Sequence, residues 1–222
     1  METDKLIDAL TADAVPVRRL HPPMMRALAW IAGAAVIVGA ISLLHGLRPD
    51  LGSKLSDPIF IVQILAAAAT GVLACIAAFQ LSVPDRSPAW IALPLPAAAM
   101  WFSVIGYGCL TDWVSLDPDG IRWGRAIDCL ATLAITSVPL WLALIAMLGR
   151  AAPMSRRLSA LTASLAVAAI TAAAMSLYHD LDATVMVLMW NLGTAMLVLG
   201  LGRAFGPAML TRTRRAGNLH AA

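Results

Sequence analysis

The stretch PIFIVQILAAAATGVLACIAAFQLS, residues 58–82, contains no Asp, Glu, Lys or Arg. An α-helix needs about 20 consecutive apolar residues to cross the ~30 Å hydrocarbon core of a bilayer. A segment inside lipid must also satisfy its own backbone hydrogen bonds, which favours a helix over an isolated strand. The stretch therefore predicts a transmembrane helix.

Five more apolar runs of similar length flank this stretch and are almost free of charged residues. The whole chain is 60% hydrophobic and only 13% charged, whereas soluble domains carry about 25% charged residues. We therefore expect an all-α, polytopic membrane protein with six transmembrane helices. In chain order the predicted spans are Ala27–Leu47, Pro58–Ser82, Ala89–Cys109, Ile127–Leu148, Leu158–Leu177 and Thr184–Ala204.

The distribution of positive charge predicts how these helices are oriented. Six crossings place both termini on the same side of the bilayer. Of the sixteen Lys and Arg residues, four lie on the opposite side, which leaves twelve on the side of the termini. Because Lys and Arg next to spans stay in the cytoplasm, we expect an N-in/C-in topology. The predicted parts are a cytoplasmic N-terminal arm (1–26), a six-helix transmembrane domain (27–204) and a basic cytoplasmic tail (205–222).

Small side chains dominate several predicted spans, above all ALTASLAVAAITAAAMS at residues 160–176. Lipid offers no hydrophobic driving force between helices, so close approach through small residues holds them together. We expect these stretches to pack against other helices of the same chain rather than in a dimer.

Two of the three cysteines lie at the ends of consecutive predicted spans. Cys109 ends the third span and Cys129 begins the fourth, so both fall at the predicted outer face. Neighbouring antiparallel helices lie ~8–10 Å apart, and a disulfide needs Cα atoms ~4.4–6.8 Å apart. Two unrelated thiols, a permanent disulfide and a switchable disulfide are all open alternatives. Cys75, deep in the second span, is expected to be a buried small hydrophobe.

His179 follows the fifth predicted span on the same outer side. Thiolate and imidazole ligands suit soft or borderline metals, so Cys109, Cys129 and His179 at one face could bind such a metal. No short-range ligand spacing and no CxxC motif indicate a permanent metal site. Cys109, Cys129 and His179 are thus the candidate redox or metal sensor residues.

The N-terminal arm carries an apolar stripe in an otherwise polar segment. Leu6, Ile7 and Leu10 share one face at helical spacing. This stripe could dock into the groove of a partner protein. It could also lie on the membrane surface, with the basic residues that follow it against anionic lipid. Those basic residues are Arg18, Arg19 and Arg26.

Motifs that would indicate catalysis are absent from the sequence, which contains no phosphate-binding loop, HExxH or GxSxG. The spans hold no mid-membrane acid or base of the kind that transporters use, so a small transporter is disfavoured. Two Tyr and four Phe are too few for a surface that stacks on bases. We therefore expect no enzyme activity, no cofactor and no direct contact with nucleic acid.

Five motifs give the chain a resemblance to the NrsF family. They are DKLIDALTADAVPVRRL at residues 4–20, GLRPDL at 46–51, LSVPDRS at 81–87, GYGCLTDW at 106–113 and RAAPMSRRL at 150–158. The resemblance implies a six-helix protein of the bacterial inner membrane that acts as an anti-sigma factor of extracytoplasmic-function sigma factors. It also implies that the arm helps hold the sigma factor away from RNA polymerase, and that outer-face cysteines sense oxidative or heavy-metal stress.

One position departs from the pattern of that family. Many relatives carry His-Cys where this chain has Tyr178–His179, so His179 replaces an outer cysteine. The switch here could use Cys109 with Cys129, capture metal through Cys129 and His179, or be lost. The rival hypothesis is a membrane thiol oxidoreductase that passes electrons to quinone, although the chain lacks the CxxC that such enzymes often use.

Overall fold

The computed structural model describes residues 3–5, 7–8, 20–112, 123–149, 156–178 and 193, and these ranges contain helices and turns but no strand. The side chains of residues 106–112 and 123–130 fall outside this description. The sixth predicted span, 184–204, lies outside the described residues except for residue 193, and the predicted basic tail lies outside them entirely.

Between residues 23 and 178, the described chain forms five long helices and two short ones. They are α2 (Pro23–His45), α3 (Leu51–Lys54), α4 (Pro58–Leu81), η1 (Pro88–Ala92), α5 (Leu95–Asp112), α6 (Trp123–Gly149) and α7 (Arg156–Tyr178). Five segments within them are long and apolar enough to cross a membrane. The first five predicted spans therefore correspond to helices of the right length and composition.

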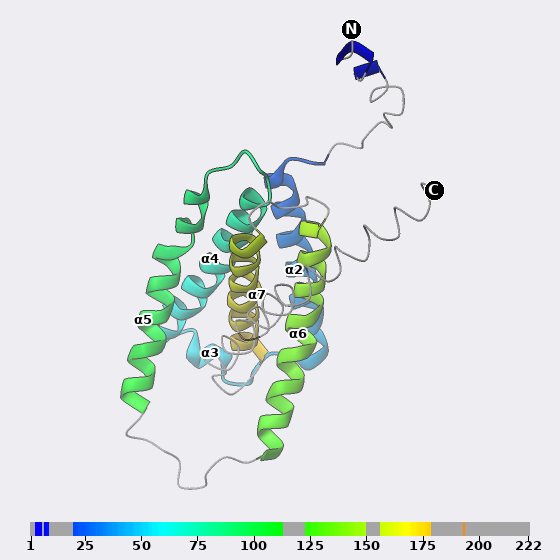
Figure 1. The fold of residues 1–222 in the computed structure, drawn as a ribbon. Helices are drawn as coiled ribbons and strands as arrows, with labels where there is room; N and C mark the ends of the chain where they lie inside the picture. Colours follow the sequence, from blue (N-terminus) through cyan, green and yellow to red (C-terminus); the bar gives the residue numbers. More distant parts are fainter. Residues whose placement is uncertain are drawn as a thin grey trace.

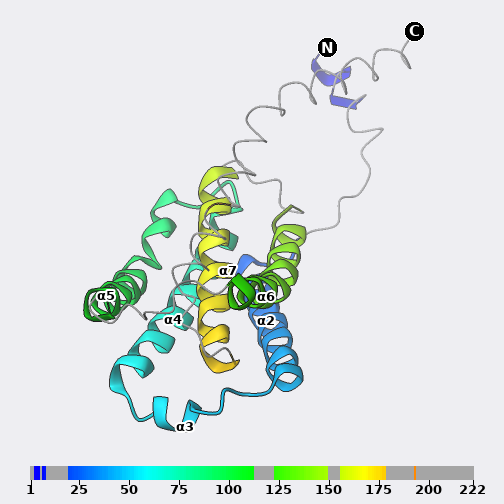
Figure 2. The same cartoon turned by 90° about the horizontal axis from the view of Figure 1, so that it is seen from below.

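The long helices form an up-and-down bundle with two ends (Figure 1). We call the end where α2 and α7 begin and α4 and α6 finish the arm end. The opposite end, which carries α3 and the last turns of α2 and α7, is the far end. Seen from below, α7 lies between α4 on one side and α2 and α6 on the other, and α5 packs on the outer side of α4 (Figure 2).

The third predicted span, Ala89–Cys109, differs from the structure in its first turns. Residues Pro88–Ala92 form a 3₁₀ helix, and the α-helix begins only at Leu95. Pro94 and Pro96 have no amide hydrogen to donate, so an α-helix cannot run through both. The oxygen of Ser87 accepts a hydrogen bond from the amide of Ala89 (3.2 Å) and caps the 3₁₀ helix instead.

Small residues bring α4 and α7 into the closest contact of the bundle. A Cβ atom added to Gly71 on α4 would lie 2.6 Å from the Cγ1 atom of Ile170 on α7, and 3.1 Å from its backbone nitrogen. Only a residue without a side chain allows this approach. Along α7, alanines such as Ala166, Ala168 and Ala169 are fully buried. The prediction that the small-residue stretch at 160–176 packs within the chain is thereby confirmed.

Several hydroxyl groups inside the apolar helices bond to the backbone one turn earlier. Thr70 donates to the carbonyl of Ala66 (2.7 Å), and Thr162 donates to that of Leu158 (2.9 Å). Such local bonds let polar residues lie in a membrane helix without an unsatisfied donor. The apolar side chains gather in two clusters, one around Trp101 and Leu133 and one around Phe79 and Leu140.

Candidate functional site

The candidate sensor residues belong to the far end of the bundle. Position 109 lies in the last turn of α5, and position 129 lies near the start of α6. Their side chains, and all of His179, lie outside the described residues. Redox or metal sensing by Cys109, Cys129 and His179 therefore stays a prediction.

The helices that carry the two thiols are not packed side by side. α5 packs against α4, whereas α6 packs against α7 and α2. Both views show α5 and α6 on opposite sides of α7 (Figure 1, Figure 2). Ten residues, 113–122, separate the two helices, and such a connection can reach ~33 Å when extended. A bridge between Cys109 and Cys129 would require the far ends of α5 and α6 to approach each other.

Three helices meet at the far end through the side chain of Tyr178 on α7. Its hydroxyl shares a buried 2.6 Å hydrogen bond with the hydroxyl of Thr136 on α6. Its ring stacks on the imidazole of His45 at the end of α2, with 6.0 Å between ring centroids and 27° between planes. Tyr178 directly precedes position 179, so this contact joins α2, α6 and α7 beside the candidate sensor position.

The motif GLRPDL fixes the chain that leaves α2 at the same end. Gly46 has φ = +79°, a conformation that side-chain-bearing residues rarely adopt. After this turn the amide of Arg48 donates to the carbonyl of Leu177 on α7 (3.1 Å). The guanidinium of Arg48 bonds to both carboxylate oxygens of Asp50 at 2.6 and 2.8 Å. It also lies 5.8 Å from the ring centre of Phe60 on α4.

This ion pair lowers the pKa of Asp50. The hydrogen bond from Arg48 holds the pKa of the Asp50 carboxyl below its usual range, although the carboxyl is exposed to solvent. Two parallel N–H···O bonds to one carboxylate are the strongest geometry for such a pair. Asp50 therefore stays ionised and paired with Arg48, whose amide joins this loop to α7.

At the arm end, Arg26 does not fit the alternative in which the basic residues after the stripe lie against anionic lipid. Its side chain is 8% exposed, and its guanidinium donates to the carbonyl of Met147 on α6. The same group lies over the ring of Phe79 on α4, 4.9 Å from its centre. α2 begins at Pro23, earlier than the predicted Ala27, so Arg26 belongs to the first turn of this helix. There its side chain points into the bundle, toward α6 and α4.

Trp30, one turn further along α2, makes a second bond of the same kind. Its indole nitrogen donates to the carbonyl of Leu140 on α6 (3.2 Å), and its side chain is 3% exposed. Both donors lie on the face of α2 that meets α6. Two side chains of α2 are thus hydrogen-bonded to the backbone of a helix more than one hundred residues away in the sequence.

The arm is described only in part. Residues 3–5 and 7–8 are helical, which agrees with a short helix there, and Ile7 is 52% exposed. The other predicted arm residues, Leu6, Leu10, Arg18 and Arg19, lie outside the described residues. Docking by this arm, to a partner or to a membrane surface, stays a prediction.

Cys75 occupies the position expected of it. It is a free thiol with no exposed surface, and its sulfur lies 4.0 Å from the carbonyl oxygen of Ala27. Within the described ranges, no three His, Cys, Asp or Glu side chains lie close enough together to hold a metal.

Sequence reasoning missed the contacts of Arg26, Trp30, Tyr178 and Thr136. Each carries a polar group inside or next to an apolar run, and such a group needs a partner once the helices pack. This requirement signals that a contact exists. The sequence does not say which helix supplies the partner, because that depends on the order of the helices around the bundle.

Comparisons with known proteins agree with the motifs. The family model described as NrsF, negative regulator of sigma F, matches residues 10–211. A protein of Azospira oryzae named probable anti-sigma-F factor NrsF is 28% identical over 95% of this chain and 99% of its own length. The anti-sigma-F factor NrsF of Caulobacter vibrioides is 38% identical over 39% of this chain and 41% of its own. No solved structure matches the chain. Because the family match covers most of its length, this chain belongs to the NrsF family of negative regulators of sigma F.

Proposed function

We propose that this protein is a multi-pass anti-sigma factor of the bacterial inner membrane that binds an extracytoplasmic-function sigma factor through its cytoplasmic arm. The observation that carries the proposal is the family match over residues 10–211. Two relatives named as an anti-sigma-F factor and a probable one support it. Bound to the arm, the sigma factor cannot reach RNA polymerase.

The arm is the part of the chain best suited to a protein partner. A helix with an exposed apolar residue such as Ile7 has apolar surface to bury, and amphipathic helices dock into apolar grooves by residues at this spacing. The arm also holds acidic Asp4 and Asp8 within the same turns. Acids disfavour contact with anionic lipid, so we choose a protein partner over the membrane surface.

Co-purification of the full chain with a sigma factor tests this proposal. Membranes from cells that make the protein are solubilised and the protein is purified. The sigma factor that co-purifies with it is then measured. The double variant Leu6→Asp, Leu10→Asp should lose the sigma factor, because two charges on the apolar stripe each cost several kcal/mol when desolvated without a partner.

The matched control keeps the stripe apolar. Leu6→Met, Leu10→Met conserves volume and hydrophobicity, so capture of the sigma factor should stay within about threefold of the unchanged protein. If the Asp variant captures as much sigma factor as the Met variant, the arm has no part in binding.

For the signal, we propose a periplasmic redox or heavy-metal stimulus that acts on Cys109, Cys129 and His179. Oxidation would join the two thiols and pass two electrons and two protons to the oxidant. A soft metal would instead bind the thiolate of Cys129 together with the imidazole of His179. Either event changes the relative stability of two helix arrangements, which is what a signal must do to release a bound partner.

Replacements of His179 and Cys129 test whether these residues form the sensor. His179→Cys supplies a third outer thiol, so the oxidant needed for half-maximal release of the sigma factor should fall, by about tenfold if thiol pairing becomes easier by ~1.4 kcal/mol. Cys129→Ser removes the residue common to both routes and should abolish release by oxidant and by cadmium. Unchanged release by the Cys129→Ser variant would exclude the sensor.

The thiol oxidoreductase is not favoured. The family to which the chain belongs consists of regulators, and its description mentions no electron transfer. Purified protein that oxidised a dithiol at the expense of quinone would reverse this preference.

A further inference from the structure

The helices of the bundle are held together in two different ways. α4 and α7 pack through backbone contact, with Gly71 lying against Ile170. α2 and α6 are joined by hydrogen bonds from the side chains of Arg26 and Trp30 to carbonyl oxygens of α6. The first contact is a closely packed seam, and the second is a pair of polar links at defined positions.

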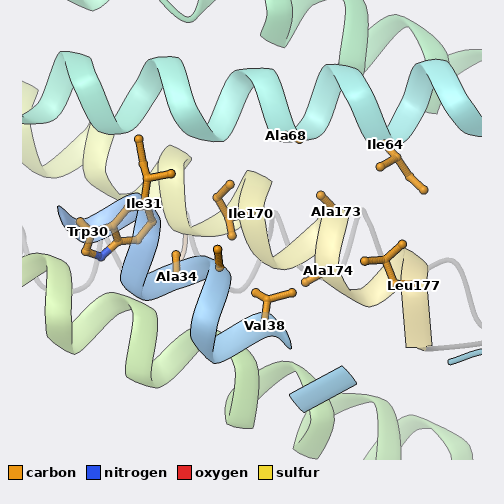
Figure 3. Close-up of a pocket in the computed structure, with 11 residues that line it drawn as sticks. Trp30, Ile31, Ala34, Val38, Ile64, Ala68, Ile170, Ala173, Ala174 and Leu177 are labelled. Atoms are coloured by element: carbon orange, nitrogen blue, oxygen red, sulfur yellow. The ribbon is translucent and has the colours of Figure 1, made fainter. Parts of the chain in front are cut away.

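An apolar pocket of about 250 Å³ lies between α2 and the seam of α4 and α7, beside the places where α2 contacts these helices (Figure 3). Figure 3 shows Ala34 and Val38 of α2 facing Ile170, Ala173 and Leu177 of α7 across this space. Atoms that line an empty space lose the dispersion contacts of a packed interface. Because the lining is apolar, α2 can shift against α4 and α7 here without exposing a buried polar group.

At the far end, polar contacts join α7 to α6 and α2. Tyr178 of α7 bonds to Thr136 of α6 and stacks on His45 of α2. A change at Tyr178 therefore acts on α2 and α6 together. It also acts next to position 179, which the proposed signal uses.

α6 extends from this contact to the arm end along one face. Thr136, Leu140 and Met147 are four and seven residues apart, a spacing that keeps residues on the same side of a helix. Position 129 lies seven residues before Thr136 in the same register. One face of α6 thus carries, in order, a candidate thiol position, the partner of Tyr178 and the acceptors of Trp30 and Arg26.

We propose that Arg26 and Trp30 are positioning residues of the anti-sigma activity: they join α2 to α6, so that a shift of α6 at the far end moves the start of α2 and with it the arm. The inference rests on the proposed function for its link to the sigma factor. The helix coupling itself is independent of that function and can be measured without a partner.

Amide hydrogen exchange of the full chain in lipid nanodiscs tests the coupling. Tyr178→Phe removes the bond to Thr136 and leaves a ring to stack on His45. Ser103→Ala on α5 removes a hydroxyl that bonds only within its own helix in the structure (2.8 Å to the carbonyl of Ala99) and is the matched control. Both changes are made in the unchanged protein and in the double variant Trp30→Phe, Arg26→Met, which lacks both links. Exchange is followed at residues 23–30, 140–149 and 66–78.

In the unchanged background, Tyr178→Phe should raise exchange at residues 23–30 and 140–149 by about three- to tenfold, the effect of one lost buried hydrogen bond. Residues 66–78 of α4 and the Ser103→Ala control should not respond. In the double variant, the exchange response to Tyr178→Phe should persist at 140–149 and disappear at 23–30. Arg26→Lys in place of Arg26→Met keeps a charged donor and should restore the response at 23–30.

Two results would overturn the coupling. One is an equal response at 23–30 whether or not the two links to α6 are intact, and the other is an equal response of α4. The affinity for the sigma factor provides the functional readout: Tyr178→Phe should alter it only when Arg26 and Trp30 are present. If no variant or unchanged protein binds a sigma factor, the proposed function fails while the exchange result still decides the coupling.

Discussion

The contacts of Arg48 show how a single polar residue fixes the end of an apolar helix against its neighbours. Its backbone amide bonds to α7, its guanidinium bonds to Asp50 and it lies over Phe60 of α4. These contacts are possible because Gly46 turns the chain with a positive φ. The residues of the motif GLRPDL thus have a structural role at the far end, where three helices must be held in register.

The pH dependence of stability follows from the Arg48–Asp50 pair. The pKa of Asp50 is lower in the folded state than in the unfolded chain, because Arg48 bonds to the ionised form. The pair therefore stabilises the fold above the unfolded-state pKa, and this contribution is lost as the pH falls through the folded-state pKa. Asp50→Asn should lower the unfolding temperature of the detergent-solubilised protein at pH 7.

The difference between Asp50→Asn and the unchanged protein should shrink as the pH falls below about 4, the ordinary range of an aspartate. Asp85→Asn, in the loop between α4 and η1, is the control for removal of one exposed carboxylate. A difference that grows as the pH falls would mean that folding raises the pKa of Asp50, so that the protonated carboxyl and not the ion pair stabilises the fold.

At the scale of helices, the α4–α7 seam depends on one glycine. A Cβ atom at position 71 would lie 2.6 and 2.7 Å from two side-chain carbons of Ile170 and 3.1 Å from its backbone nitrogen. The side chain can rotate away but the backbone cannot, so Gly71→Ala should force the helices apart. Overpacking of this kind costs ~1–3 kcal/mol, measurable as a lower unfolding temperature.

Gly33→Ala provides the comparison for Gly71→Ala. Gly33 lies in the middle of α2 with no atom within 4 Å of an added Cβ. Alanine favours a helix over glycine by up to ~1 kcal/mol, so this variant should be as stable as the unchanged protein or more stable. Equal destabilisation by the two changes would mean that the seam tolerates a side chain.

Individual helices were predictable from the sequence, because lipid requires long uncharged runs. The run at 58–82 matches α4 to within one residue, and α7 extends the run at 158–177 by two residues at its start and one at its end. The start of α5 was placed six residues early, because apolarity continues through Pro88–Pro96 while the capacity to donate hydrogen bonds does not. Composition predicts the extent of an apolar segment, and proline placement decides where the α-helix starts.

The order of helices around the bundle could not be predicted. The third and fourth predicted spans were treated as neighbours, yet the corresponding helices pack elsewhere: α5 packs on α4, and α6 packs on α7 and α2. Short loops favour sequential neighbours, but the connection from α5 to α6 is long enough to pass α7. The partners of Arg26, Trp30 and Tyr178 depend on this order, so those contacts were also beyond the reach of the sequence.

For the whole molecule, the number of crossings decides where the C-terminus lies. The described chain contains five helices that could span a membrane, and five crossings alone would place the two termini on opposite sides. The sequence predicts a sixth crossing by residues 184–204, which would return the chain to the side of the arm. It would also place Arg212, Arg214 and Arg215 in the cytoplasm, as expected of positive residues that flank a span.

Reporter fusions distinguish five crossings from six. Alkaline phosphatase, active only in the periplasm, should be inactive when fused behind Arg215 and active when fused behind Asp117, between α5 and α6. A green fluorescent protein that folds only in the cytoplasm should give the reverse pattern.

Fusion behind Arg86, between α4 and η1, is the internal control, because two crossings from the arm return that loop to the arm's side. Phosphatase activity behind both Arg86 and Asp117 would mean that α5 does not cross. Activity behind Arg215 would place the basic tail outside, away from any sigma factor, and leave the arm as the sole cytoplasmic terminus.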